Sequence, residues 1–250
     1  MTLKIYPSLP GLTFPVLKQA EFDTLVETAP NKYDVRLPQT VNPLWSWQLV
    51  YDLVRDFVIA GSSFTVSELR TMLDYFMYHG GQAKDFLFLD PDDNYVGPAM
   101  VAGSPNAPLA QLQIVNDGAG NYFSPIQRTF GGLFYEDITD LNIDPGAGGI
   151  VPVIYANGVL QTPSGGSPNY SIAGPGLAVP GASFGGMYLA WTAAPAGPVT
   201  AQFNFYFRVR FEMDMQDMEK FSNKFWTIGG SESQKGSGQI KLIQSRPNPL

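Results

Sequence analysis

Strict alternation of apolar and polar residues runs through 15 positions near the C-terminal end of the chain, from Val199 to Met213. Valine, alanine, phenylalanine and methionine occupy the odd-numbered positions, and the even-numbered positions carry polar residues that include Arg208 and Arg210. Successive side chains of a β-strand point to opposite faces, so this pattern predicts one strand roughly 50 Å long, at about 3.3 Å per residue. Its polar face is expected to meet water and is suited to lining a lumen. For the two arginines, ordinary cross-strand pairs are favoured over contacts with a neighbour or with passing DNA.

The rest of the chain also indicates a mainly β fold. It holds 26 glycines and 21 prolines, which favour turns because glycine permits positive φ and proline fixes φ. Aromatic residues make up 13% of the chain, and this combination is typical of many short strands. Further strands are predicted over residues 33–37, 45–53, 85–90, 111–115, 122–130, 151–155, 159–161, 187–192, 225–228 and 239–244. Hairpin turns are predicted at residues 117–120 and at Asn157-Gly158, and one or two helical turns over residues 214–222.

One amphipathic helix is predicted over residues 65–79. Thr65 is placed as its N-cap, and Glu68 completes a capping box three residues later. Apolar residues at helical spacing predict that the helix lies on a sheet and buries one stripe: Val66, Leu69, Met72, Leu73, Phe76 and Met77. Gly80 and Gly81 are expected to end the helix.

No charged residue and no histidine occurs from Pro145 through Phe207. An average composition would place on the order of 16 charges there. Three interpretations are open: a disordered segment, a solvated β-insert that lacks charge, and a β-insert whose faces meet neighbouring subunits. The strand patterns inside the segment favour the third. Residues 91–108, rich in glycine and proline, are predicted to form a long loop of the kind used as an interaction arm.

Composition also excludes several classes of function. Charged residues are only 15% of the chain, against about 25% in ordinary domains, which favours surface that contacts other proteins. The net charge of −7 argues against general nucleic-acid affinity, which needs lysine and arginine. The absence of cysteine excludes disulfides and thiolate zinc sites. Residues 1–10 do not resemble a signal peptide, and no run of 18 apolar residues exists. We therefore expect that the protein does not insert into a membrane and that it is first located in the cytoplasm of a cell.

Candidate metal-binding groups are few. His79 is the only histidine, which excludes a multi-histidine site, and at a helix C-terminus a protonated imidazole would favour the helix dipole. Residues 90–94 begin like a calcium loop, but Tyr95 and Val101 stand where glycine and glutamate are required. An Asp-rich turn is the favoured interpretation.

Candidate catalytic groups are equally few. Ser124, Ser167 and Ser231 lack the context of a nucleophile elbow. Glu136 with Asp137 is a possible glycosidase pair, although 22 acidic residues make some pairing inevitable. Neither a phosphate-binding loop nor a dinucleotide motif occurs. We therefore predict a protein that is not an enzyme, with no catalytic, cofactor-binding or metal-binding residues and no cofactor.

Short motifs follow one order along the chain. They are Phe14-Pro15, Trp47-Gln48-Leu49 with Tyr51 and Arg55, Phe76 with Gly80-Gly81, Phe86 to Pro91, Gln111-Leu112, Tyr122 with Arg128, and Phe205 with Val209 to Asp214. This series resembles the distal tail proteins of long-tailed bacteriophages and gene transfer agents, over roughly residues 10–215. Residues 153–159 are similar to a hairpin of phage tail components. The chain departs from the family in two respects. The Arg-rich segment that the family typically has near its N-terminus is represented here only by Lys32 and Arg36, and the uncharged insert is longer than the family leads us to expect.

The resemblance implies a tail-tube-like antiparallel β-sandwich or barrel with one flanking helix. Residues 1–135 and 200–250 are expected to form the tail-tube-like β-domain, and residues 136–199 a Gly/Pro-rich uncharged β insert. Six copies would form a ring in the virion tail, joining the tail tube protein to the tail hub or tip protein. DNA would pass through this ring during ejection without specific binding, which an acidic ring favours.

Three alternatives remain open at this point. The chain fits a tail tube protein, which would share most of these patterns. It also fits a receptor- or carbohydrate-binding tail-tip module, which would need Trp45, Trp47 or Trp191 in an open groove. A tail-associated hydrolase would need a cleft with close carboxylates.

Overall fold

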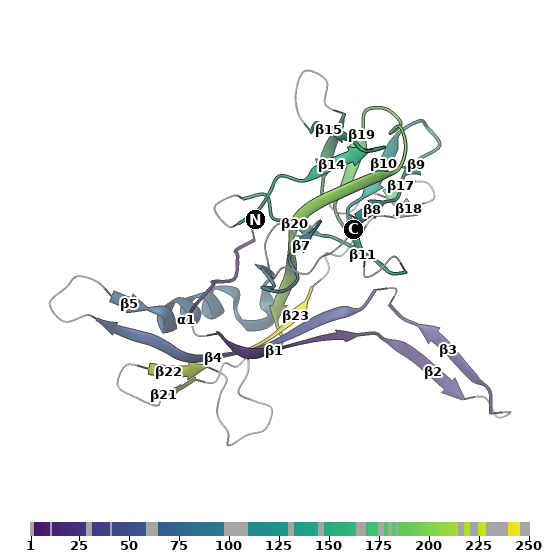
Figure 1. Ribbon diagram of the computed structural model, residues 1–250. Coiled ribbons are helices and arrows are strands. Elements are labelled where there is room, and N and C mark those ends of the chain that lie inside the picture. The colour runs from purple at the N-terminus through teal and green to yellow at the C-terminus, as the bar shows by residue number, and fades with distance from the viewer. Residues whose placement is uncertain are drawn as a thin grey trace. The chain divides into compact units, whose positions relative to one another are not determined.

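The computed structural model describes residues 3–10, 12–28, 32–40, 42–58, 65–97, 110–129, 133–144, 148–163, 169–174, 178–179, 182–183, 185–214, 218–220, 225–228 and 240–245. The described part of the chain is mainly β, with antiparallel sheets and one α-helix, which confirms the predicted class (Figure 1). It divides into two compact units. The first unit comprises Met1–Phe86 and Val209–Ser245, and the second Leu87–Arg208 and Arg246–Leu250.

These limits differ from the division at residues 136 and 199 that composition suggests. The uncharged segment pairs directly with the long strand: Val153 lies opposite Gln202 and Tyr155 opposite Thr200. Strand pairing depends on backbone hydrogen bonds, to which charge content is irrelevant. A change in composition therefore does not mark the edge of a compact unit here.

The first unit is built around one 15-residue strand, β4 (Leu44–Val58). Antiparallel partners lie along it in several places: β1 (Leu12–Glu21), β23 (Ile240–Gln244), β22 (Phe225–Ile228) and β5 (Thr65–Ser67). Trp47, Leu49 and Tyr51 are buried, so alternate residues of the strand predicted over 45–53 face the core. The two strands predicted over 225–228 and 239–244 are confirmed, the second over residues 240–244, and each pairs with β4.

A strand stands where the sequence indicates helical turns over residues 214–222. This strand, β21 (Met218–Lys220), pairs with β22, and Lys220 lies opposite Trp226. The prediction of helix is therefore wrong for the described part of this stretch. Pairing with a strand already held in the sheet satisfies the backbone groups that an isolated helical turn would satisfy poorly.

The helix α1 (Glu68–His79) begins three residues later than predicted. Thr65 belongs to β5, the N-cap is Ser67, and the cap makes no side-chain hydrogen bond. Glu68 accepts hydrogen bonds from the backbone N–H (3.0 Å) and the guanidinium of Arg55 instead of closing a capping box. The predicted cap is therefore wrong, because a partner 13 residues away in sequence captures the carboxylate.

The apolar stripe of α1 is only partly buried. Leu69 and Met72 are buried, whereas Met77 is 72% exposed. The predicted end of the helix is confirmed: Gly80 adopts the left-handed conformation, with φ 63°, and its N–H bonds to the carbonyl of Met77. A single 3-10 turn follows, η1 (Gly81–Ala83).

Aromatic rings fill the core beside α1. Phe86 stacks with Tyr6 at 5.8 Å between ring centroids and meets Phe211 at 4.8 Å. Tyr75 of the helix meets the edge of Phe86 at 5.3 Å. Such pairs contribute about 0.5–1.5 kcal/mol each beyond their buried area, so this cluster holds α1 in place.

In the second unit, several strands pair with β20 (Val199–Phe211), whose first ten residues belong to this unit. Partners of β20 are β6 (Phe86–Phe88), β7 (Tyr95–Val96), β8 (Ala110–Leu112), β13 (Asp140–Leu141) and β14 (Val153–Ala156), and β15 (Val159–Gln161) follows β14. The long strand is confirmed at 13 residues, and its odd-numbered side chains are buried. Its other face is half-buried: Tyr206 is buried there, whereas the remaining even-numbered residues are partly exposed, so the expected wetted face is confirmed only in part.

The second unit has a further four-stranded sheet and two small ribbons. The sheet runs in the order β16 (Tyr170–Ala173), β19 (Tyr188–Trp191), β10 (Tyr122–Pro125) and β9 (Val115–Asn116). The ribbons are β11 (Gln127–Thr129) with β12 (Tyr135–Asp137), and β17 (Ala178–Val179) with β18 (Ala182–Ser183). The strands predicted over 111–115 and 122–130 are thus each divided into two shorter ones.

Much of the uncharged segment is ordinary β-structure with a core. Ile154, Tyr170 and Leu189 are fully buried, so disorder is excluded for the described part of the segment. The turn after β14 is confirmed, because Asn157 and Gly158 have φ 50° and 76°, as a type I′ hairpin requires. The turn at residues 117–120 is also confirmed, with Asp117 accepting bonds from the N–H groups of Ala119 and Asn121. Of the predicted loop over 91–108, residues 95–96 form β7, and residues 98–108 lie outside the described part.

Candidate interaction surfaces

A two-stranded hairpin leaves the end of the first unit's sheet. Its strands are β2 (Thr24–Thr28) and β3 (Asp34–Pro38), and together we name them the arm. The arm begins where β1 and β4 end their pairing, at Glu21 and Leu44, and it extends past both strands (Figure 1). Its base is closed by a hydrogen bond of 2.7 Å from the N–H of Gln39 to the carbonyl of Asp23. Among the described strands, β2 and β3 pair only with each other.

Every residue of the arm is exposed. Leu25 lies opposite Leu37 in the register, and their side chains are 47% and 56% exposed. Val35, two residues from Leu37 and therefore on the same face, is 60% exposed. We name Leu25, Val35 and Leu37 the arm's apolar face; Glu27, opposite Val35, shares this face.

The opposite face of the arm is more polar. Arg36 pairs with Asp34 at 3.4 Å, and the hydroxyl of Thr28 donates to the same carboxylate at 3.1 Å. Val26, which is 55% exposed, lies opposite Arg36. The sequence predicts the strand over residues 33–37, but it predicts neither the partner strand β2 nor the exposure of the arm.

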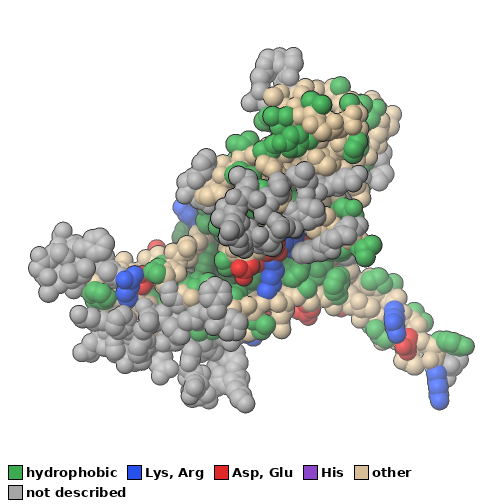
Figure 2. Space-filling view, in the orientation of Figure 1, with side chains coloured by type: hydrophobic (Ala, Val, Ile, Leu, Met, Phe, Trp, Pro, Cys, Tyr) green, Lys and Arg blue, Asp and Glu red, His purple; other side chains and the backbone are tan. Residues whose placement is uncertain are grey.

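A second uncovered surface lies on the sheet formed by β15, β14 and β20. Register places Leu160 beside Tyr155 and Tyr155 beside Thr200, and it places Val153 beside Gln202. We name this surface the uncharged face, and we define it by these five residues, Val153, Tyr155, Leu160, Thr200 and Gln202, together with Val151, which precedes Val153 by two residues. Val151 and Leu160 are 59% and 56% exposed. Over β14 and β15, Figure 2 shows hydrophobic side chains and no charged ones.

The three residues of β15, at the edge of this sheet, include no charged residue and no proline. Among the described strands, β15 pairs only with β14. Edge strands commonly carry lysine or proline, or are covered, because their unpaired backbone groups invite another strand. The three residues of β15 are Val159, Leu160 and Gln161, and Val159 is 64% exposed.

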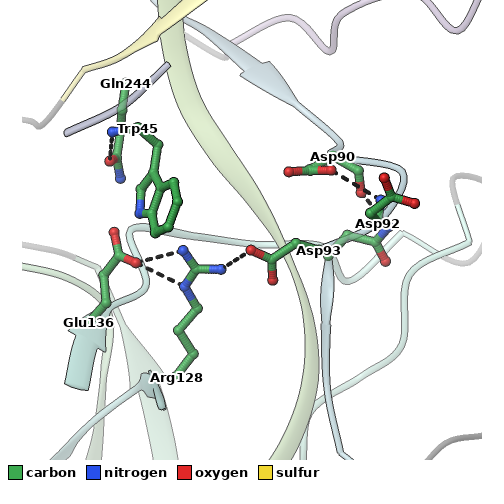
Figure 3. Close-up of polar contacts among 8 residues, drawn as sticks. Trp45, Asp90, Asp92, Asp93, Arg128, Glu136 and Gln244 are labelled. Carbon is green, nitrogen blue, oxygen red and sulfur yellow. Dashed lines mark hydrogen bonds and ion pairs between the residues drawn. The ribbon is translucent and has the colours of Figure 1, made fainter. Parts of the chain in front are cut away.

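The most buried ion pair of the second unit joins Arg128 of β11 to Glu136 of β12 (Figure 3). The Nε and a terminal nitrogen of Arg128 donate to one oxygen of Glu136 at 2.9 and 2.6 Å, and Asp93 pairs with the other end of the guanidinium. The guanidinium also lies over the rings of Phe205 and Phe207, at 5.3 and 4.9 Å. Since Arg128 and Glu136 are each about 3% exposed, this arrangement is a structural tie between the ribbon and β20.

Both carboxylates of the possible glycosidase pair, Glu136 and Asp137, have hydrogen-bond partners in the fold. Glu136 faces Arg128, while its neighbour Asp137 accepts bonds from the Gln127 amide (2.7 Å) and from the N–H of Gly185 (3.1 Å). Adjacent residues of a strand point to opposite faces, so the structure does not bring the two carboxylates together. Ser124 is buried and accepts a hydrogen bond from the indole of Trp191 at 3.0 Å. Ser167 and Ser231 lie outside the described residues.

The aspartates at residues 90–93 form a turn, as favoured from the sequence. Asp90 accepts a bond from the backbone N–H of Asp92 at 3.0 Å, and the side-chain amide of Asn94 donates to the carbonyl of Asp90 at 2.6 Å (Figure 3). In the described part of the chain, no three acidic, histidine or cysteine side chains gather as a metal site would require. The carboxylate of Asp90 therefore caps a turn.

His79 is buried at the end of α1, where its Nδ1 lies 2.7 Å from the carbonyl of Tyr75. Burial lowers the pKa of this imidazole below its usual value, and nearby Lys84 lowers it further, although the bond to Tyr75 opposes both. The imidazole is therefore neutral at neutral pH. Burial therefore opposes the protonated imidazole that the C-terminal end of a helix would favour.

The remaining candidates are also engaged in the fold. Trp47 is fully buried and Trp191 is 8% exposed, so neither lines an open groove; Trp45 is half-buried beneath the ammonium of Lys18, which is 4.7 Å from its ring. Arg208 makes two bonds to Asp140 of the neighbouring strand, at 3.1 and 2.8 Å, which confirms the favoured cross-strand pair.

A scan against protein-family models gives no match, and a search of curated proteins gives none either. Within the described residues, no helix combines the length and the apolar character needed to cross a membrane. The structure therefore defines a mainly β protein with antiparallel sheets, and the two uncovered surfaces are its candidate functional features.

Proposed function

We propose that this chain is a structural virion protein, a distal tail adaptor whose copies form a ring between the tail tube and the tail tip or hub. The observation that carries the proposal is the arm, a hairpin with every residue exposed and three large aliphatic side chains on one face. A two-stranded hairpin is marginally stable in water without further packing. Such an arm is accounted for if another subunit covers it in the assembled state.

The positions of the motif residues support a structural protein. Trp47, Phe86 and Phe211 lie in the core of the first unit, Gly80 ends the helix, and Arg128 is a buried tie. These motif residues therefore serve packing, turns and a buried ion pair, and none of them presents a reactive group in a cleft. A resemblance carried by such residues points to a shared architecture, and we read the function from that architecture.

Six copies of an acidic chain would form a ring of strongly negative charge, which lets DNA pass without holding it. The described surfaces give no specific support to the other candidates. A carbohydrate-binding groove would need exposed tryptophans, and the glycosidase pair has structural partners.

Native mass spectrometry of the purified chain, over a range of concentrations, tests the proposal. We expect a closed species of six times the 27.3 kDa subunit mass, visible as a ring by electron microscopy. A chain that stays monomeric at every concentration, and that is missing from the tail of the assembled particle, would disprove the proposal.

A further inference from the structure

We propose that the arm's apolar face docks on the uncharged face of a second copy of this chain. This inference rests on the proposed ring and names the surfaces that join its subunits. The two surfaces are different parts of the chain, one formed by residues 24–38 and the other by residues 151–202.

The arm's apolar face is the surface that most needs a partner. Leu25, Val35 and Leu37 are each 47–60% exposed on strands that have no third strand beside them among the described ones. Removing such side chains from water is favourable, at about 25 cal/mol for each Å² of apolar area. The same contact would also order a hairpin that is marginal by itself.

Charge selects the uncharged face as the docking surface. Placing aliphatic side chains over a charged group removes that group's water, which costs free energy unless a counter-charge is supplied. None of the six residues of the uncharged face is charged, and Val151 and Leu160 offer exposed aliphatic surface. Such a surface receives the aliphatic side chains of the arm, Leu25, Val35 and Leu37, without that cost.

The single charge on the arm's apolar face also finds suitable chemistry there. Glu27 lies opposite Val35, and its carboxylate can only accept hydrogen bonds. The hydroxyl of Thr200 and the amide of Gln202 on the uncharged face are donors. Neutral donors facing a carboxylate make the two surfaces electrostatically complementary, where a second carboxylate would repel it.

The geometry of repetition favours a second copy over another protein. A contact between two different patches of one chain is heterologous, and each added copy presents both patches again. Such contacts close into a ring when a whole number of identical rotations between neighbouring subunits completes one full turn. One contact of this kind, repeated, therefore builds the whole ring.

Two substitutions on opposite faces of the arm test the proposal. Val35→Asp places a charge on the apolar face, and Val26→Asp is a matched control, since these valines are 60% and 55% exposed on the same hairpin. We expect Val35→Asp to abolish the oligomer at concentrations where the unaltered chain is fully assembled, and Val26→Asp to retain it. Circular dichroism and thermal melting of both variants verify that the fold is intact. Equal assembly of the two variants would overturn the inference.

Crosslinking tests the contact directly, because the chain contains no cysteine. Leu37→Cys combined with Leu160→Cys, treated with a short bis-maleimide, should give a ladder of covalent oligomers that ends at the ring size. Val26→Cys combined with Leu160→Cys is the control and should give no ladder.

The outcomes separate this inference from the proposed function. A ring by native mass without a ladder overturns the docking of the arm and leaves the ring standing. A ladder that ends at dimers supports the contact between copies and overturns the ring. A crosslink within single chains overturns the docking, and a monomer with no crosslink overturns both proposals.

Discussion

The arm's strand β3 and the strand β20 show the same alternation of residues but opposite environments. In β20, Phe203 and Val209 are fully buried on the apolar side of the strand. In the arm, Val35 and Leu37 alternate with polar residues in the same way, yet both are more than half exposed. A period of two indicates which side chains share a face, whereas burial depends on what lies against that face. An alternating strand without a cover is therefore a candidate for contact with another molecule.

The largest expected difference is in the cost of shortening an apolar side chain. Phe203→Ala should lower the free energy of unfolding by about 4 kcal/mol, because it leaves a cavity in a closed core. Leu37→Ala in the arm should change it by less than about 0.5 kcal/mol in the monomer. Chemical denaturation of both variants checks this. A large loss for Leu37→Ala would mean that the arm is covered within its own chain.

Two arginine–carboxylate pairs give the next largest contrast. Arg128→Met leaves the buried carboxylate of Glu136 without its counter-charge and should cost about 3 kcal/mol. Arg36→Met removes a pair whose side chains are 70% and 42% exposed, and such surface pairs contribute less than about 1 kcal/mol. Thermal melts of the two variants in parallel measure the difference. Similar costs would contradict the structural role assigned to Arg128.

Substitution of two glycines with positive φ distinguishes the cost of backbone strain from the cost of steric crowding. A Cβ at Gly81, with φ 60°, would stand 2.5 Å from an oxygen of Asp214, whereas one at Gly118, with φ 77°, would have no heavy atom within 4 Å. Gly118→Ala should cost about 1 kcal/mol through backbone strain. Gly81→Ala should cost about 2–3 kcal/mol, since crowding adds to the strain. If equilibrium unfolding gives equal costs, the close approach of Asp214 is wrong.

The smallest expected effect is on pH dependence. Burial lowers the pKa of His79 in the folded state, so below about pH 6.5 the unfolded chain binds this proton more readily. Stability should therefore decline as the pH falls from about 6.5 toward the lowered pKa, and it should recover above that window. His79→Gln should remove this part of the decline, as measured by melting temperature between pH 5 and 7.5. An unchanged profile would mean that the imidazole is not held neutral by the fold.

Local patterns predicted several elements correctly because the physical reason lies in neighbouring residues. The I′ turn at Asn157-Gly158 needs two residues that tolerate positive φ, and the end of α1 needs a glycine such as Gly80. Predictions failed where a distant residue changed the outcome. Glu68 accepts hydrogen bonds from Arg55 and so does not form the predicted capping box. Residues 218–220 pair with β22 as a strand, where helical turns were predicted.

The candidate surfaces were predicted in part. Charge content by itself marked residues 145–207 as unusual, and Val151, Val159 and Leu160 are exposed there. Much of the segment, however, is the core of the second unit, with Ile154 and Tyr170 fully buried, and a charge-free sequence does not distinguish these two uses. The arm was indicated only as a short strand, because its exposure results from the absence of a covering layer among the described residues.

The sequence by itself determined the mainly β class, the long strand β20, the end of the helix and several turns, because these follow from side-chain periodicity and backbone preference within a few residues. Only the tertiary structure decided which alternating strand is buried, which carboxylates are neutralised and where the compact units divide. Those outcomes depend on contacts between residues far apart in the chain, such as Arg55 with Glu68 or Val153 with Gln202. Burial is a property of the assembled layers, and no single stretch of sequence contains it.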